Sequence, residues 1–156
     1  MTHCEGRITG LQRSAGGVPK LPVEHVRVHA AGMEGDRQAN RRYHGGPDRA
    51  LCLYSQERLD ALSAEGHPVG RGSLGENVTI AGLPWELVQP GSRLRLGAVE
   101  VAVTAFAPPC ETIGNAFVGR KFIRVSQVVN PGWSRVYVRI LGDGELSVGN
   151  VVTLAP

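Results

Sequence analysis

Residues 35–55 read GDRQANRRYHGGPDRALCLYS. The end of this stretch, Ala50 to Tyr54, is apolar at successive positions, so as a β-strand it has no polar face. Such a strand is covered on both sides and belongs in the centre of a fold. Directly before it, the stretch carries four arginines, a histidine and a Gly-Gly-Pro turn. The sequence therefore predicts a cationic turn that is held in place by a central strand.

A helix is expected directly after the central strand. Ser55 is suited to cap a helix over residues 56–65, in which Leu59 and Leu62 share one face. Gly66 supplies a residue that can end it. No other window is as typical of a helix.

Short segments of alternating polarity flank this unit on both sides. The predicted strands are Arg7–Leu11, Pro22–Val28, a short one at Val78 and Ile80, Arg93–Leu96, Val99–Val103, Val136–Ile140 and Val148–Leu154. In the strand 136–140 the alternation predicts a solvent face made of Arg135, Tyr137 and Arg139. Together with 21 glycines and 10 prolines, these strands predict a mainly β fold, a β-barrel with one clear helix and minor helical segments. We expect a single domain over residues 1–156.

Composition excludes several classes of protein. No apolar stretch approaches the length of a membrane span, and the start MTHCEGR lacks the layout of a signal peptide. The three cysteines form no CxxC pair, which favours a reduced, cytosolic protein. A net charge of +3 and only 5% aromatic residues fit a small anionic ligand better than nucleic acid.

Cys110 is the strongest candidate for chemistry. Pro108 and Pro109 fix two φ angles before it, so the preceding strand cannot continue and the thiol lies at a stiff strand exit. Glu111-Thr112-Ile113 can begin a helical turn, and a helix start with arginines nearby would stabilise a thiolate. The alternative is a buried, inert cysteine. We assign Cys52 to the core, and Cys4 has no evident role.

Other polar segments are weaker candidates for the same site. Paired glycines after His44 let backbone N–H groups approach a ligand, and Arg49 then leads into the central strand. Arg37 follows Asp36 at a turn, where the carboxylate could orient the guanidinium. Asn77 can cap backbone groups or contact a ligand. Each of these segments could equally serve loop geometry alone.

A second small loop that could receive an anion comprises Arg13-Ser14 and the glycines after it. Familiar catalytic motifs are absent: there is no Walker loop, no G-x-G-x-x-G, no G-x-S-x-G and no H-E-x-x-H. A zinc site from His44, Cys52 and Cys110 matches no zinc spacing and would need Cys52 out of the core.

Four ordered motifs resemble the MOSC domain, named after the C-terminal domain of molybdenum cofactor sulfurase. They are Gly35-Asp36-Arg37, His44-Gly45-Gly46-Pro47-Asp48-Arg49-Ala50, Gly75-Glu76-Asn77 with Gly82-Leu83, and Pro109-Cys110. The resemblance covers nearly the whole chain. It implies a MOSC-type β-barrel and a connection to the molybdenum cofactor, molybdopterin.

The resemblance also implies roles for individual residues. Cys110 matches the cysteine that gives a thiolate to molybdenum or carries sulfur, and both roles suit a soft donor. By position, Arg13, Ser14 and Arg37 correspond to loops that hold pterin and phosphate, and Asn77 corresponds to the loop asparagine.

His44 and Arg49 match the conserved HGG tract of the resemblance. Ala107 is a departure, since many bacterial members have an arginine three residues before the cysteine, where it would place positive charge beside the metal. The chain lacks an aminotransferase-like part with a Schiff-base lysine, so we expect no covalently bound pyridoxal phosphate.

We expect a small molybdoenzyme that reduces N-hydroxylated compounds, a small-molecule substrate class, with electrons from a partner reductase. The first alternative is a carrier of the cofactor or of its sulfur, loaded as a Cys110 persulfide by a cysteine desulfurase. The second alternative is of a different class, a non-catalytic barrel that binds an anion or a partner.

Overall fold

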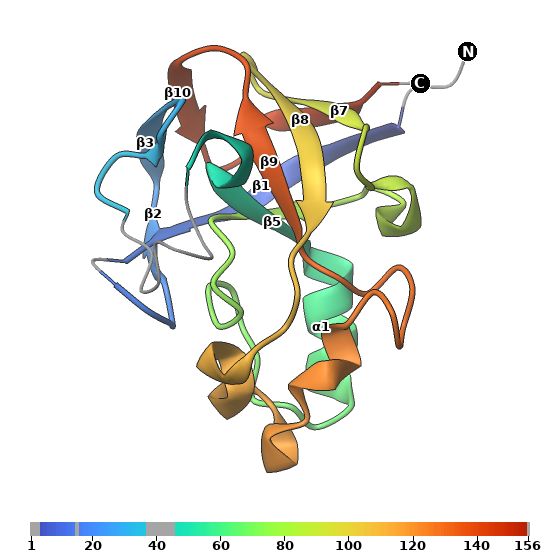
Figure 1. The fold of residues 1–156 in the computed structure, drawn as a ribbon. Coiled ribbons are helices and arrows are strands. Elements are labelled where there is room, and N and C mark those ends of the chain that lie inside the picture. The colour runs from blue at the N-terminus through green and yellow to red at the C-terminus, as the bar shows by residue number, and fades with distance from the viewer. Residues whose placement is uncertain (1–3, 15, 37–45, 156) are drawn as a thin grey trace.

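The structure is a computed structural model that describes residues 4–14, 16–36 and 46–155. Its centre is a closed barrel of seven strands (Figure 1). They are β1 (Cys4–Arg13), β5 (Leu51–Ser55), β6 (Val78–Ala81), β7 (Arg93–Leu96), β8 (Val99–Phe106), β9 (Val136–Ile140) and β11 (Val151–Leu154). The order around the barrel is β1-β11-β7-β8-β9-β5-β6, and β6 pairs again with β1. All pairs are antiparallel except β5–β6. The prediction of a mainly β barrel is confirmed.

Four further strands lie outside the barrel. β2 (Leu21–Val23) pairs with β1, whereas β3 (His25–His29) lies between β10 (Gly144–Ser147) and β4 (Gly32–Met33) in a separate sheet. The predicted single strand over 22–28 is therefore wrong, because the chain changes from one sheet to the other at Glu24. The predicted closing strand 148–154 begins only at Val151, since residues 148–150 turn between β10 and β11.

The unit of β5 and α1 (Gln56–Ala64) matches its prediction closely. All five residues of β5 are buried. The Oγ of Ser55 accepts a hydrogen bond from the N–H of Arg58 at 3.2 Å, which caps the helix. Leu59 and Leu62 are the buried residues of α1. The helix connects β5 to the parallel strand β6, so one short segment sets up both a central strand and its neighbour.

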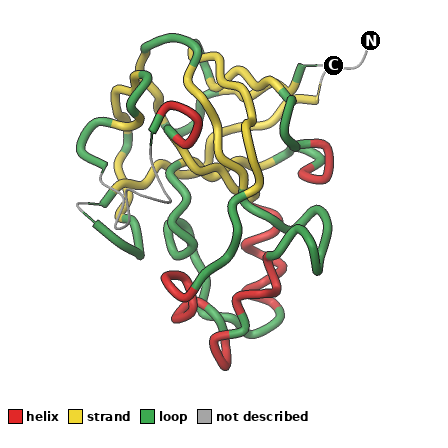
Figure 2. The backbone as a smooth tube through the Cα atoms, viewed as in Figure 1, coloured by secondary structure: helices red, strands yellow, loops and turns green. Residues whose placement is uncertain are grey.

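Apart from α1, the helical segments among the described residues are short 3₁₀ turns. They are η1 (Pro47–Arg49), η2 (Trp85–Leu87), η3 (Glu111–Ala116), η4 (Val118–Arg120) and η5 (Phe122–Val125). Three of them lie in residues 107–135, which we call the 107–135 excursion because it leaves the barrel after β8 and returns to the adjacent strand β9. Figures 1 and 2 show the barrel in one half of the molecule and α1 with this excursion in the other.

The solvent face predicted for the strand 136–140 is wrong. Arg135 and Tyr137 are buried, at 4% and 5% exposure, and only Arg139 is exposed. Val136 and Val138, on the opposite face of the strand, are completely buried in the main hydrophobic core. Both faces of β9 near Tyr137 are therefore covered, and the outer one carries polar groups. No helix among the described residues is long and apolar enough to cross a membrane.

Candidate functional site

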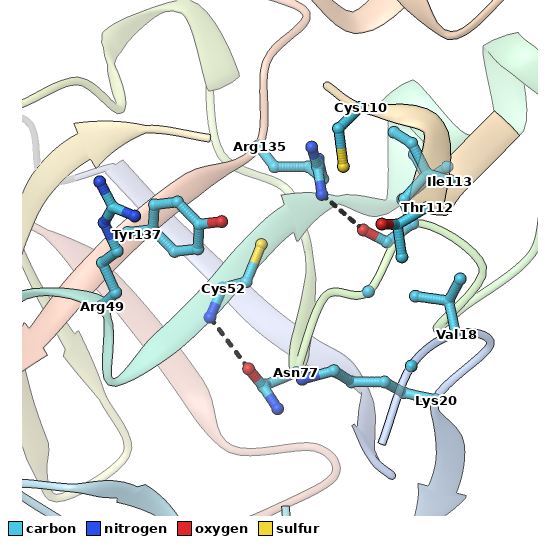
Figure 3. A pocket seen from close by; sticks show the side chains of 13 residues that line it. Val18, Lys20, Arg49, Cys52, Asn77, Cys110, Thr112, Ile113, Arg135 and Tyr137 are labelled. Atoms are coloured by element: carbon cyan, nitrogen blue, oxygen red, sulfur yellow. Dashed lines mark hydrogen bonds between the residues drawn. The ribbon is translucent and has the colours of Figure 1, made fainter. Parts of the chain in front are cut away.

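A cavity of about 70 Å³ lies on the outer face of β5 and β9, and Cys110 lines it (Figure 3). Cys52 and Tyr137 also line it, and they are direct cross-strand neighbours in the β5–β9 pair. The rest of the lining comes from the loop segments around residues 17–20 and 74–77, from the start of the 107–135 excursion, and from two arginines, Arg49 and Arg135. A space of this size admits a small chemical group.

Cys110 is held as the sequence predicts. It precedes η3, and the N–H of Ile113 donates to its carbonyl at 3.1 Å. The N–H of Ala107 donates to the carbonyl of Arg135 at 2.9 Å, which fixes the chain three residues earlier. Cys110 is partly exposed and is a free thiol. Figure 3 shows its sulfur beside the end of the Arg135 side chain.

The charged residues that line the cavity are all cationic. They are Lys20, Arg49 and Arg135, and no aspartate or glutamate is among the described residues that line it. Positive charge around a partly enclosed space attracts anions, and low-dielectric walls strengthen the attraction.

Arg135 is the most unusual of the three cations. Its Nη1 donates to the carbonyl of Leu74 at 2.7 Å, and its Nη2 donates to that of Pro108 at 3.2 Å and more distantly to that of Ala107 at 3.5 Å. Its Nε is buried and has no hydrogen-bond partner in the part of the chain that the structure describes. Among the described residues, no carboxylate lies within 4.0 Å of the guanidinium, so its buried charge is not neutralised by an ion pair.

Lys20, in contrast, is neutralised. Its Nζ lies 2.8 Å from Oδ2 of Asp36, and the two side chains are only 7% and 2% exposed. The backbone of Lys20 is fixed by its N–H, which donates to the carbonyl of Gly72 at 3.0 Å. A Cβ at Gly72 would approach the carbonyl oxygen of Lys20 to 2.1 Å, so only glycine permits this contact.

Arg49 is placed by contacts of its neighbour Asp48 with two barrel strands. The carboxylate of Asp48 accepts from Nε of Arg139 on β9 at 2.8 Å, and its carbonyl accepts from the hydroxyl of Thr104 on β8. The guanidinium of Arg49 lies over the ring of Tyr137, 5.4 Å from the centroid. The prediction that a rigid element holds this turn agrees with these contacts.

Asn77 lines the cavity, but its amide is bonded within the protein. Its Oδ1 accepts from the N–H of Cys52 at 3.0 Å. Its Nδ2 donates to Asp36 at 3.0 Å and to the carbonyl of Gln12 at 3.3 Å, which uses both amide hydrogens. A direct bond from this amide to a ligand would have to replace one of these.

The other predicted site residues lie away from Cys110 or outside the described residues. Arg13 and Ser14 line a neighbouring surface hollow. The Nη1 of Arg13 donates to the carbonyl of Glu34 at 2.9 Å, and the N–H of Ser14 donates to Asp36 at 3.0 Å. Asp36 is thus bonded to Ser14, Lys20 and Asn77.

Arg37 and His44 lie outside the described residues, so their predicted roles stay predictions. The two recesses share one loop, since residues 17, 18 and 20 line the cavity and residues 16 and 19 line the hollow.

Burial raises the pKa of several acidic groups near the cavity, Tyr137 among them. Burial raises the pKa of the Cys52 thiol to about 11, although the charge of Arg135 opposes the effect. Burial likewise raises the pKa of Glu76 to about 7, and the bonds that its carboxylate accepts offset this only in part. Cys52 is therefore a neutral thiol near neutral pH, as expected for a core cysteine, although it also lines the cavity.

Lys20 and Arg135 were missed by reasoning from the sequence. Nothing in the alternation separates Arg135 from the exposed Arg139 on the same strand. The 107–135 excursion covers Arg135 and leaves Arg139 in solvent, and this determines the difference in their burial.

No group of three or more histidines, cysteines, aspartates or glutamates among the described residues could hold a metal ion. Cys110 and Cys52 are the sulfur-bearing side chains of the cavity. A metal in it would need donors from its own cofactor besides the protein thiolate.

Known proteins resemble this chain over most of its length. The family model of the MOSC domain matches residues 40–153. The uncharacterised protein YflK of Bacillus subtilis is 34% identical over 138 residues, which is 85% of this chain and 60% of YflK. Protein YiiM of Escherichia coli is 34% identical over 105 residues, which is 64% of this chain and 47% of YiiM.

A solved structure, YiiM from Geobacillus stearothermophilus, superposes with a TM-score of 0.72 at 23% identity, over 97% of this chain and 75% of that one. This likeness shows the fold. The chain spans less than two thirds of the length of the two curated relatives.

Proposed function

Because the chain belongs to the MOSC domain family, we propose that it binds a molybdenum cofactor in the Cys110 cavity and reduces N-hydroxylated compounds with electrons from a partner protein. The observation that carries this proposal is that the Cys110 thiol, Arg49 and Arg135 line one cavity, and that its described lining residues include no carboxylate. A soft thiolate suits molybdenum, and the cations suit the anionic groups of the cofactor.

The residues present fit such a group. Burial of a charge without an ion-pair partner is costly, and Arg135 bears this cost in the absence of an anion. An anionic group in the cavity would offset it. Cys110 has the partial exposure that a metal ligand on a cavity wall requires.

Each residue of the chain would have a distinct task. Cys110 would hold the metal, and Arg49 with Arg135 would face its anionic groups. The cavity is too small for a whole pterin, so Arg13 and Ser14 in the neighbouring hollow would bind the pterin phosphate. The hydrogen bonds of Asn77 and Asp36 would hold the loops of the cavity and of the neighbouring hollow in fixed positions relative to each other.

When bound, the cofactor would supply two-electron oxygen-atom transfer, which converts an N-hydroxyl group to an amine and water with two electrons and two protons. The electrons would come from a partner reductase. The part of the chain that the structure describes would hold and orient the reacting groups and keep the thiolate available.

The test is metal and pterin analysis of protein made in a host that synthesises the cofactor. We expect molybdenum and pterin near one per chain in wild type, and loss of molybdenum in Cys110→Ala. Cys4→Ala is the matched control and should retain both. Protein that takes up neither group, even after reconstitution with released cofactor, would contradict the proposal.

A second candidate is sulfur transfer, which the partial exposure of Cys110 favours because a partner's persulfide could reach it. The Cys110 thiolate would attack the outer sulfur of that persulfide, release the partner's thiolate and become a persulfide itself. Incubation with a cysteine desulfurase and cysteine should then load Cys110 in wild type and in Cys4→Ser. Equal loading of Cys110→Ser would eliminate this candidate.

A further inference from the structure

Arg135 combines three features that a purely structural arginine does not require together. Its side chain is 4% exposed, it lacks a carboxylate partner among the described residues, and it lines the same cavity as Cys110. Its hydrogen bonds all go to neutral carbonyl groups. No negatively charged group among the described residues therefore pairs with this guanidinium.

The nearby acids do not remove this charge. The charge of Arg135 acts on Glu76, but burial raises the pKa of that carboxyl to about 7, so it is only partly ionised at neutral pH. The neighbouring Cys52 and Tyr137 are neutral there, because burial raises the pKa of both. Asp36 is already paired with Lys20. An external anion is the partner that would neutralise Arg135.

The hydrogen bonds of Arg135 fix the position of its guanidinium and hence the place where a bound anion would lie. Through Leu74 and Pro108 the guanidinium joins the 74–77 loop to the segment that leads into Cys110. Residues of both the 74–77 loop and the segment that begins at Cys110 line the cavity. Figure 3 shows the Arg135 side chain beside Cys110, with the sulfur directed into the same space.

We propose that Arg135 is the residue that recognises a small oxyanion group bound next to Cys110, and that it holds the two loops that enclose this group. The inference deepens the proposed function and rests on the Cys110 cavity being its ligand site. Arginine suits this task because its planar fork keeps its charge and can bond to carbonyls and an oxyanion at the same time.

The first experiment measures binding of sulfate and of molybdate to the purified protein without cofactor, by calorimetry at constant ionic strength. Wild type should bind one oxyanion per chain. Arg135→Gln should lose about tenfold to a hundredfold in affinity, as expected for a charge-assisted hydrogen bond. Arg135→Lys should lose less, because it keeps the charge but loses the fork.

Arg95→Gln is the matched control, since Arg95 is an exposed arginine on β7 that is paired with Glu100 and does not line the cavity. It should bind oxyanions as wild type does. Affinity of Arg135→Gln equal to that of wild type, or the absence of oxyanion binding by wild type, would overturn the inference.

A second readout locates the anion and does not depend on the stability of Arg135→Gln. Bound oxyanion should slow alkylation of Cys110 in wild type, as followed by peptide mass spectrometry, and leave Cys4 unaffected. The Nε–H resonance of Arg135 should shift during the same titration, and that of Arg95 should not. Slower alkylation of Cys4 rather than Cys110, or a shift of the control arginine's resonance rather than that of Arg135, would contradict the assignment of the anion to Arg135.

Failure of this inference is distinguishable from failure of the proposed function. Cys110→Ala should keep its oxyanion affinity while losing molybdenum. Oxyanion binding that depends on Arg135 in a protein that never acquires cofactor would leave the inference standing and remove the proposed function.

Discussion

Arg135 lies directly opposite Ala107 at the point where β8 and β9 diverge. The N–H of Ala107 donates to the carbonyl of Arg135 at 2.9 Å, and Nη2 of Arg135 turns back to the carbonyls of Ala107 and Pro108. The MOSC resemblance leads us to expect an arginine at the position of Ala107. Here a guanidinium reaches the same backbone from the facing strand, so positive charge near Cys110 does not depend on residue 107.

This contact predicts that a positively charged side chain at position 107 would be repelled by the guanidinium of Arg135. Ala107 is completely buried beside Cys52 and Tyr137, so Ala107→Arg would add volume and a second cation next to Arg135. We expect the free energy of unfolding to fall by about 1–3 kcal/mol in urea denaturation. Removing the charge of Arg135 as well should recover part of the loss, since the double variant keeps one guanidinium.

The control for this pair is Ala107→Met, which adds volume without charge and should gain nothing from Arg135→Gln. If Ala107→Arg were equally destabilised in the presence and absence of Arg135, the two positions would not interact. That result would show that the charge of Arg135 does not act on the segment that leads to Cys110.

Glu76 predicts a specific pH dependence of stability. Its pKa is raised from 4.5 in a model peptide to about 7 by burial. Between these values the native state binds more protons than the unfolded state, so the free energy of unfolding falls as pH rises through this window. Glu76→Gln should flatten the fall and, at pH 8, stabilise the protein by up to about 3 kcal/mol.

The measurement is the urea midpoint of both proteins from pH 4.5 to 8. Glu111→Gln, which replaces an exposed carboxyl, should keep the pH dependence of wild type. An unchanged slope in Glu76→Gln would show that the buried carboxyl does not cause it.

Asn77 is predicted to act on stability more than on binding. Asn77→Ala would leave the N–H of Cys52 without an acceptor and would remove one hydrogen-bond donor to Asp36. We expect the free energy of unfolding to fall by about 1–3 kcal/mol as a result. The melting temperature should fall by about 2–4 °C for each kcal/mol, while molybdenum content below the transition stays close to that of wild type. Asn115→Ala, an exposed control, should melt as wild type does. Full stability with loss of molybdenum would instead make Asn77 a ligand-binding residue.

The three thiols should differ strongly in reactivity. With a pKa of about 11, only about one Cys52 in a thousand is a thiolate at pH 8, and its side chain is buried. Iodoacetamide should therefore label Cys4 and Cys110 in the native protein and Cys52 only after denaturation. Labelling of Cys52 at the rate of Cys4 would show that the cavity is open to reagents.

The parts of the fold that the sequence predicts are those with local causes. β5 and α1 follow from an unbroken apolar run, a serine cap and Gly66, and the structure confirms them. The strand over 22–28 was wrong because local alternation carries no information about the partner strand, and that partner changes at Glu24.

The candidate site likewise has a part that the local sequence predicts and a part that it does not. The two prolines before Cys110 predict the strand exit, the residues after it allow a helical turn, and both features are present. Arg135 was assigned to solvent because an alternating strand normally has one wet face. The 107–135 excursion covers that face through contacts distant in sequence, which periodicity cannot reveal.

X-ray absorption at the molybdenum edge tests the central claim most directly, because it counts the sulfur atoms bound to the metal. Cofactor-loaded wild type and Cys110→Ser would be compared, with Cys52→Ser as a control for the other thiol of the cavity. Binding of the metal through Cys110 predicts one sulfur ligand fewer in Cys110→Ser and no change in Cys52→Ser. Equal sulfur counts in wild type and Cys110→Ser would contradict it.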